Sequence, residues 1–251
     1  GLGDVYKRQN KFLSLVTNYE NLNVMKLLGK GLTVFVIDYN GMAADNSIQS
    51  YGNNVEAGRA MLDGARAVRE LKGLNKNVPV GIWGFSQGGS ASYVGAALQP
   101  SYAPDVNLKV SYVGAPPIDL LGTLKSIEGG ALSGLLGYGI NGYAGTYPGV
   151  KQAVDENVNA KGRKNLAKIG NSCVADTLMG YAYQDTAKWT KDGKPLVAFL
   201  NKYPEVLKIF QDQLNASTKT PKARVVLYAN RSDAVIPYDT VKTGVNTWCK
   251  A

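Results

Sequence analysis

Residues 78–91, Val-Pro-Val-Gly-Ile-Trp-Gly-Phe-Ser-Gln-Gly-Gly-Ser-Ala, contain the pattern from which the fold of this chain is inferred. The first part, 78–85, is a short apolar run rich in β-forming residues, which predicts a strand. From Gly88 onward, small residues open a helix that is predicted to continue to about Leu98. Between strand and helix lies Gly84-Phe85-Ser86-Gln87-Gly88, a G-x-S-x-G pentapeptide. This order predicts a nucleophile elbow.

The residue types of the pentapeptide suit an elbow for steric and electrostatic reasons. The chain turns so tightly that Ser86 is expected to take a strained backbone conformation, with bulk excluded at Gly84 and Gly88. The Ser86 hydroxyl then stands at the carboxyl edge of the sheet, where a helix N-terminus directs free N–H groups. The N–H of Gln87 is the predicted oxyanion-hole donor, with an effect of about 3 kcal/mol on a transition state. An ordinary glycine-rich turn is the alternative.

Other segments repeat the alternation of strand and helix. Further strand-length apolar runs are Leu32–Ile37, Leu108–Val113 and Ala223–Ala229. Predicted helices are Glu20–Leu28, Val55–Leu71 with Gly73 as its C-terminal cap, and one from Tyr238. Near-continuous apolar runs such as Leu32–Ile37 are typical of parallel strands with both faces covered. The pattern predicts an α/β-hydrolase fold, with a mostly parallel sheet flanked by helices.

The predicted hydrolase core is interrupted by a long insertion. Residues 119–220 separate the last two predicted strands and are interpreted as a helical cap, with core segments at 10–118 and 221–251. Helical patterns in the insertion are Leu132–Leu136, Val174–Tyr183 and Leu196–Leu214.

The composition fits a globular protein, with 45% hydrophobic and 19% charged residues in a chain of 251. The apolar runs are far shorter than the ~20 residues of a membrane helix. The formal net charge is +9, but lysines and arginines are scattered without interleaved aromatic residues. This distribution favours a solvated basic surface over a nucleic-acid face. Attraction to an anionic lipid interface stays open.

Two residue types limit the chemistry that the chain can support. Cys173 and Cys249 cannot form a metal site alone and show no CxxC spacing. They either form one disulfide, as in an oxidising compartment, or are two unrelated thiols. Histidine is absent, although a serine nucleophile needs a general base at neutral pH.

The acid of a Ser-acid-His triad follows the serine in chain order in this fold. Asp233, in the loop after the last predicted strand, is the preferred candidate, because a carboxylate there can hold an imidazole in its reactive tautomer. The alternative is that Asp233 shapes its loop as an Asx-turn. Asp119 is a weaker candidate for the acid, and Asp239 is interpreted as a helix-start residue.

The two ends of the sequence suggest a fragment. Residues 1–9 resemble a translated sequencing adapter and are excluded from fold reasoning, so the natural sequence is expected to begin near Asn10. Truncation at both ends would place the histidine beyond Ala251 and the second oxyanion loop before Asn10. The alternative is a hydrolase-fold protein that binds without catalysis.

Several segments together resemble the secretory lipase family, relatives of fungal lipase A, and the actinobacterial branch most of all. They are Asn18–Glu20, Val36–Tyr39, Gly58–Leu71, Gly84–Gly89, Pro100–Pro104, Gly114–Leu120, Ser232-Asp233 with Pro237-Tyr238, and Trp248-Cys249. The resemblance covers nearly all of residues 16–249.

This resemblance implies a secreted, extracellular triacylglycerol lipase or esterase that acts through an acyl-enzyme. Ser86 would be the nucleophile, Asp233 the triad acid and 119–220 a cap over an acyl pocket, while Cys173 and Cys249 would be disulfide partners. The substrate would be a lipid or small ester, with no metal, organic cofactor, nucleic acid or partner protein implied. Without histidine, the chain as given would be nearly inactive. An acyltransferase or peptidase on the same elbow is the alternative enzyme.

Overall fold

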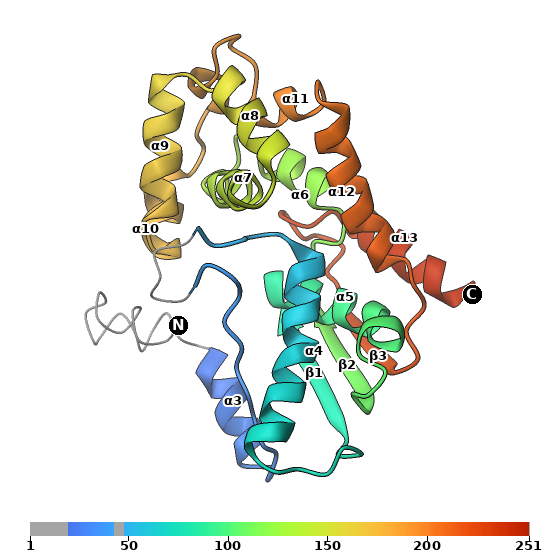
Figure 1. Ribbon diagram of the computed structural model, residues 1–251. Coiled ribbons are helices and arrows are strands. Elements are labelled where there is room, and N and C mark those ends of the chain that lie inside the picture. Colours follow the sequence, from blue (N-terminus) through green and yellow to red (C-terminus); the bar gives the residue numbers. More distant parts are fainter. Residues whose placement is uncertain (1–19, 43–47, 251) are drawn as a thin grey trace.

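The computed structural model describes residues 20–42 and 48–250, so the predicted adapter segment 1–9 lies outside the described residues. A small sheet with its packed helices forms one layer, and a group of helices forms a second layer beside the carboxyl ends of the strands (Figure 1). The elements in chain order are α3 (Glu20–Leu28), α4 (Asn54–Leu71), β1 (Val80–Phe85), α5 (Gln87–Tyr102), β2 (Leu108–Gly114), α6 (Leu120–Ile127), α7 (Leu135–Thr146), α8 (Pro148–Asn157), α9 (Ala160–Gly170), α10 (Val174–Tyr181), the short 3₁₀ helix η1 (Thr186–Trp189), α11 (Leu196–Leu200), α12 (Pro204–Ser217), β3 (Arg224–Tyr228) and α13 (Tyr238–Cys249).

The sheet has the order β1-β2-β3, and both pairs of neighbouring strands are parallel. This confirms the parallel α/β arrangement and three of the predicted strands. The prediction of a strand at Leu32–Ile37 is wrong, because that segment has no strand assignment and no ladder partner among the described residues. It lies along α4 instead, where a Cβ built on Gly64 would stand 2.7 Å from Ile37 Cγ2.

Helix α5 packs against β1 and β2, and α4 packs against α5, which it crosses at two glycines. A Cβ on Gly58 would stand 2.8 Å from the backbone nitrogen of Gly95, so the two helix backbones are in direct contact. The opposite face carries the alternate residues of the strands, whose exposed fractions run from 36% for Trp83 to 57% for Tyr228. The expectation that both faces are covered is therefore wrong for the part of the chain that the structure describes.

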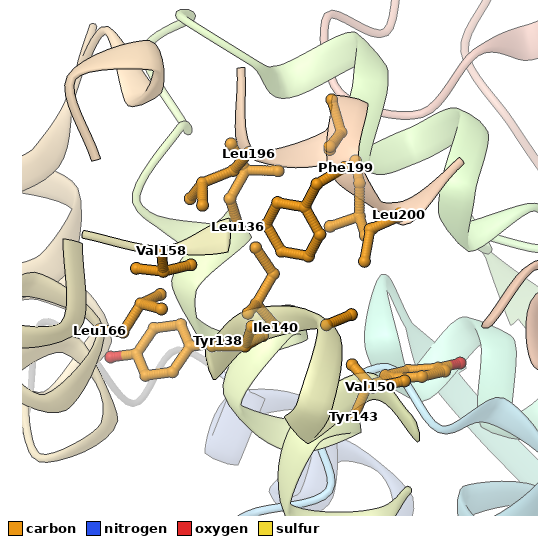
Figure 2. Packing of buried hydrophobic residues seen from close by; sticks show 14 of the residues in the cluster. Leu136, Tyr138, Ile140, Tyr143, Val150, Val158, Leu166, Leu196, Phe199 and Leu200 are labelled. Atoms are coloured by element: carbon orange, nitrogen blue, oxygen red, sulfur yellow. The ribbon is translucent and has the colours of Figure 1, made fainter. Parts of the chain in front are cut away.

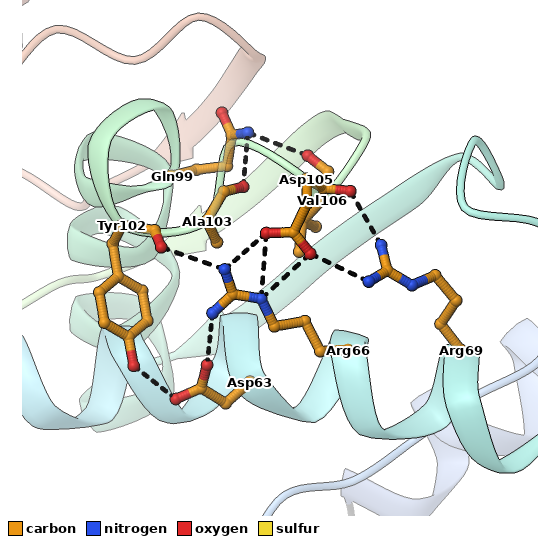
Figure 3. A network of polar contacts seen from close by, with 8 residues as sticks. All are labelled: Asp63, Arg66, Arg69, Gln99, Tyr102, Ala103, Asp105 and Val106. Carbon is orange, nitrogen blue, oxygen red and sulfur yellow. Dashed lines mark hydrogen bonds and ion pairs between the residues drawn. The ribbon is translucent and has the colours of Figure 1, made fainter.

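The end of α4 is fixed by a backbone motif and by an ion-pair network. Gly73 has φ +59°, and the N–H groups of Gly73 and Leu74 donate to the carbonyls of Glu70 and Arg69, so the predicted glycine cap is confirmed. Arg66 and Arg69 both bind the Asp105 carboxylate from the neighbouring α5–β2 loop (Figure 3). The hydrogen bond from Arg66 holds the pKa of Asp105 well below its usual range. The ion pairs thus join the end of α4 to the α5–β2 loop.

Helices α6 to α12 form the second layer around a hydrophobic cluster of their own. Leucines and aromatic residues from α7 and α11 meet in its centre, including Leu136, Phe199 and Leu200 (Figure 2). The predicted run Leu196–Leu214 is divided into α11 and α12, because Pro204 cannot continue a helix and begins the next one instead. The core beside the sheet is a separate cluster.

Candidate active site

Ser86 stands at the turn between β1 and α5 in a strained backbone conformation, with φ +55° and ψ −116°. Its N–H donates to the carbonyl of Gly114 over 2.9 Å, and its carbonyl accepts from the N–H of Ser90 over 3.0 Å. A serine at a helix N-cap usually caps the helix with its hydroxyl, but Ser86 makes no such hydrogen bond. The hydroxyl therefore remains available for another partner.

The glycines of the pentapeptide do not have equal roles. A Cβ on Gly84 would stand 2.1 Å from the carbonyl oxygen of Gly88, which leaves no room for any side chain. A Cβ on Gly88 would meet nothing closer than the Tyr39 hydroxyl at 3.9 Å, so the expectation that Gly88 must lack bulk is wrong. Outside the pentapeptide, Gly89 has the second steric role, because its Cβ would stand 2.1 Å from the Gly114 oxygen.

Ser86 and Gln87 line a small cavity of about 40 Å³ between the sheet layer and the helical layer. The other lining residues are Tyr51, Gly52, Asn54, Pro117, Leu120, Thr123, Leu124, Ile127, Leu135, Val235 and Ile236. Gln87 is the first residue of α5, so its N–H has no carbonyl partner within the helix. The two elbow residues Ser86 and Gln87 thus line one largely apolar cavity.

Several polar side chains in the cavity wall are already engaged. The Asn54 amide nitrogen donates to the carbonyl of Pro117 over 3.0 Å, and the Thr123 hydroxyl donates to the carbonyl of Asp119 over 2.8 Å. Burial, with a smaller effect from Tyr138, raises the pKa of Tyr51 and keeps its phenol neutral. The cavity therefore suits an apolar group better than a charged one.

Asp233 lies in a loop that reaches the cavity through its next residues. One of its carboxylate oxygens, Oδ1, accepts hydrogen bonds from the N–H groups of Val235 at 2.8 Å and Ile236 at 3.0 Å. These two residues are in the cavity wall with Ser86. The loop-shaping role of Asp233 is thereby confirmed, whereas its role as a triad acid stays a prediction.

The other two aspartates considered from the sequence, Asp119 and Asp239, have local structural roles. Asp119 caps α6 by accepting a hydrogen bond from the N–H of Gly122 over 2.9 Å. This helix-capping role explains why an aspartate stands between β2 and α6. Asp239 lies in the first turn of α13, as expected of a helix-start residue. Sequence reasoning did not find the lining residues of α6, because nothing in a helical pattern shows what its apolar face contacts.

No base faces Ser86 from the described wall of the cavity. The sequence contains no histidine, and Tyr51 is the one ionisable side chain among the described lining residues. No group of acidic, cysteine or histidine residues that could hold a metal ion occurs in the ranges 20–42 and 48–250. Within those ranges, no helix is long and apolar enough to cross a membrane.

The cysteines are free thiols, so the predicted disulfide is wrong for this structure. Cys173 precedes α10 in the helical layer, whereas Cys249 ends α13 beside the sheet core. These helices lie on opposite sides of the molecule in Figure 1. A disulfide requires Cα atoms within about 7 Å of each other.

The sequence profile described as "Secretory lipase" matches residues 6–251 of this chain. The chain belongs to the secretory lipase family. One relative, the "Probable inactive lipase MT1628" of Mycobacterium tuberculosis, is 31% identical over 223 residues, which cover 88% of this chain and 48% of that protein. The "Secreted triacylglycerol lipase LIP5" of Malassezia furfur is 27% identical, covering 97% of this chain and 63% of its own length.

Solved structures agree with this assignment to the secretory lipases. Candida antarctica lipase A in its closed state matches with a TM-score of 0.72 and 25% identity, over 80% of this chain and 47% of that one. The rice cell wall degrading esterase LipA of Xanthomonas oryzae matches with a TM-score of 0.64 and 15% identity, over 84% and 59%, and so supports the fold alone. The chain spans about half the length of several relatives that it matches.

Proposed function

We propose that this chain carries the nucleophile and the acyl-binding cavity of a secreted serine carboxylic-ester hydrolase that acts on acylglycerols. The observation that supports this most directly is the uncapped, strained Ser86 at the wall of an apolar cavity. We propose that the helical layer α6–α12 is the cap predicted at 119–220. The extracellular location is proposed because related proteins are named as secreted lipases.

The proposed reaction uses each of these groups at a defined atom. The Oγ atom of Ser86 forms a bond to the ester carbonyl carbon, while its proton passes to an imidazole. The N–H of Gln87 donates to the resulting oxyanion. The C–O bond to the alcohol then breaks, the imidazolium gives its proton to the leaving alkoxide, and water later releases the acid by the reverse sequence.

Asp233 is proposed to orient and stabilise that imidazole. Its Oδ1 atom is engaged by two backbone N–H groups, which fix the carboxylate beside the cavity. The imidazole must come from a residue that these 251 residues do not contain. The chain on its own is therefore expected to form an acyl-enzyme very slowly.

A hydrolase-fold protein that binds esters without turnover is the second candidate. The absence of histidine favours it, and the Mycobacterium tuberculosis relative is named as a probable inactive lipase. The two candidates differ in whether Ser86 stands in a geometry that reacts once a base is supplied.

Chemical rescue by imidazole separates these candidates. The chain is incubated with methyl p-nitrophenyl butylphosphonate, with and without free imidazole, and the adduct on Ser86 is followed by intact-mass and peptide mass spectrometry. In this reaction the Ser86 Oγ–phosphorus bond forms, p-nitrophenolate leaves and the proton goes to imidazole. A positioned base contributes about 10²–10⁴-fold, so we expect at least about tenfold acceleration from an unpositioned one.

Two variants control this experiment. Ser86→Ala is expected to remove the adduct completely. Asp233→Asn keeps an Oδ1 acceptor for Val235 and Ile236 but removes the charge, and is expected to weaken the imidazole effect without unfolding the loop. A folded chain that gives no Ser86 adduct at any imidazole concentration would favour the binding protein.

A further inference from the structure

In the part of the chain that the structure describes, a single hydrogen bond joins the loop 230–236 to another element, and it comes from α6. We infer that Ser126 is a positioning residue, which holds the Asp233 carboxylate beside the cavity by way of the peptide group between Val235 and Ile236. The inference rests on the proposed function, because Asp233 is the acid that would orient the imidazole. It concerns a contact between the helical layer and that acid.

The remaining hydrogen bonds of this loop, among the described residues, are internal. Asp233 Oδ1 accepts from the N–H groups of Val235 and Ile236, and the Asp233 N–H donates to the carbonyl of Asn230 over 3.3 Å. Bonds within a loop fix the carboxylate relative to its own backbone and move with that backbone as a unit. The position of the carboxylate relative to the cavity therefore depends on contacts that reach outside the loop.

Ser126 provides such a contact. Its hydroxyl donates to the carbonyl of Val235 over 2.6 Å, although the two residues are 109 positions apart in the sequence. The same hydroxyl faces the Thr123 carbonyl of its own helix over 2.7 Å, and because a hydroxyl has one hydrogen, the two carbonyls share it. No other donor reaches the Val235 carbonyl among the described residues. Loss of the hydroxyl would therefore leave this carbonyl without a protein partner.

Ser126 and Asp233 bind the two ends of one peptide group. The carbonyl of Val235 and the N–H of Ile236 belong to the same peptide unit, which is planar and rigid. Ser126 Oγ donates to the oxygen of this unit, and Asp233 Oδ1 accepts from its N–H over 3.0 Å. A rotation of the peptide plane would break both bonds together. The hydroxyl of α6 and the carboxylate are thus linked through a single rigid unit.

Apolar packing holds the loop near the cavity but does not supply this orientation. The side chain of Val235 packs against both core clusters, that of the helical layer and that beside the sheet. Ile236 is 5% exposed and belongs to the cluster beside the sheet. Such contacts are non-directional, whereas a hydrogen bond weakens steeply when its angle changes. Ser126 therefore adds the directional contact that the packing lacks.

The test measures labelling of Ser86 by methyl p-nitrophenyl butylphosphonate, with and without imidazole. We expect Ser126→Ala to lower the imidazole-dependent rate by about three- to tenfold, which is the effect of losing one hydrogen bond. The rate without imidazole should not change, because Asp233 acts through the imidazole, and the loss should not exceed that of Asp233→Asn. Ser126→Thr keeps a hydroxyl at an exposed position and should restore the parental rate within about twofold.

A double variant separates positioning from a general structural effect. If Ser126 acts through the carboxylate, adding Ser126→Ala to Asp233→Asn should lower the imidazole-dependent rate no further. A further loss in that background would overturn the inference, as would an equal loss of the rate without imidazole. The hydroxyl would then support Ser86 or the cavity by another route.

Ser101→Ala is the matched control. Ser101 is also an exposed serine one residue before the end of its helix, and its hydroxyl donates to the carbonyl three residues earlier, that of Leu98, over 3.2 Å. In the described structure it makes no hydrogen bond to the loop 230–236. This variant should keep both parental labelling rates. An unchanged rate in Ser126→Ala, or an equal loss in Ser101→Ala, would overturn the inference.

Amide hydrogen exchange separates failure of the chemistry from failure of the positioning. We expect Ser126→Ala to speed exchange of the Ile236 N–H by about three- to tenfold, measured by NMR, and Ser101→Ala to leave it unchanged. This result would support the positioning of Asp233 even if Ser86 of the parent chain were never labelled, an outcome that would count against the proposed function alone. Unchanged exchange of this N–H in Ser126→Ala would overturn the inference, whatever the outcome of the labelling.

Discussion

The substitution Gly84→Ala tests the steric basis of the elbow. The added Cβ would stand 2.1 Å from the Gly88 oxygen and 2.2 Å from the Gly88 carbonyl carbon. Both atoms belong to the backbone of α5, so the clash cannot be relieved by a side-chain rotation. The start of the helix must move by roughly 1 Å to restore a normal contact, and Gly89, already in close contact with Gly114, opposes that movement.

The expected loss follows from the cost of overpacking. Inserted carbon atoms in a packed interior cost about 1–3 kcal/mol, and a backbone clash belongs at the upper end, while the stiffer unfolded chain returns about 0.4–1 kcal/mol. We therefore expect Gly84→Ala to lower the free energy of unfolding by about 2–3 kcal/mol, measured by urea denaturation followed by circular dichroism. At about 2–4 °C per kcal/mol, the melting temperature should fall by roughly 4–12 °C.

Gly88→Ala is the control in the same pentapeptide. Its Cβ meets nothing within 3.5 Å, and alanine is favoured over glycine in a helix by up to about 1 kcal/mol. This variant should be as stable as the parent or slightly more so. The steric argument is refuted if Gly84→Ala keeps the parental urea midpoint, or if Gly88→Ala loses as much stability as Gly84→Ala.

Two further predictions concern contacts that join separate parts of the chain. Because the pKa of Asp105 is lowered beside Arg66, the stabilising contribution of this carboxylate is present above about pH 4 and is lost as the pH falls below that value. Asp105→Asn should lower the free energy of unfolding by about 1 kcal/mol at pH 7, since the pair is partly exposed. The urea midpoints of parent and variant should converge toward about pH 2. Gln213 accepts from the backbone N–H of Val55 over 2.9 Å and is 7% exposed, so Gln213→Leu should cost about 1–3 kcal/mol by leaving that donor unpaired. Gln211→Leu, at an exposed position of the same helix, should change stability little, and equal losses in the two glutamine variants would contradict this account.

Local patterns predicted the elements whose shape is set by neighbouring residues in the sequence. The boundaries of α3 match the prediction, and α4 begins one residue earlier than predicted, because glycines and an Asn53 cap end or begin these helices locally. The failure at Leu32–Ile37 has a different origin. A strand is defined by a hydrogen-bonded neighbour, and an apolar run contains no information about whether that neighbour exists.

The cavity could not be predicted from local sequence patterns for the same reason. Several of its lining residues come from α6, well separated in sequence from Ser86, and glycines of other elements approach Leu120 and Leu124. The capping of α6 by Asp119 could have been predicted from the sequence, since an aspartate precedes an apolar helical run. The direction in which that apolar face points depends on tertiary packing alone.

The geometry of the elbow does not depend on the missing base. The position of Ser86 is fixed by its hydrogen bond to Gly114 and by the backbone contacts of Gly84 and Gly89. None of these contacts involves an imidazole, and Asp233 is held in place by its own loop. A nucleophile whose strain is maintained by the fold should therefore keep its reactive position in a chain without histidine. This is why free imidazole is expected to restore reactivity at Ser86, and why a failure of rescue would count against the elbow itself rather than against the missing residue.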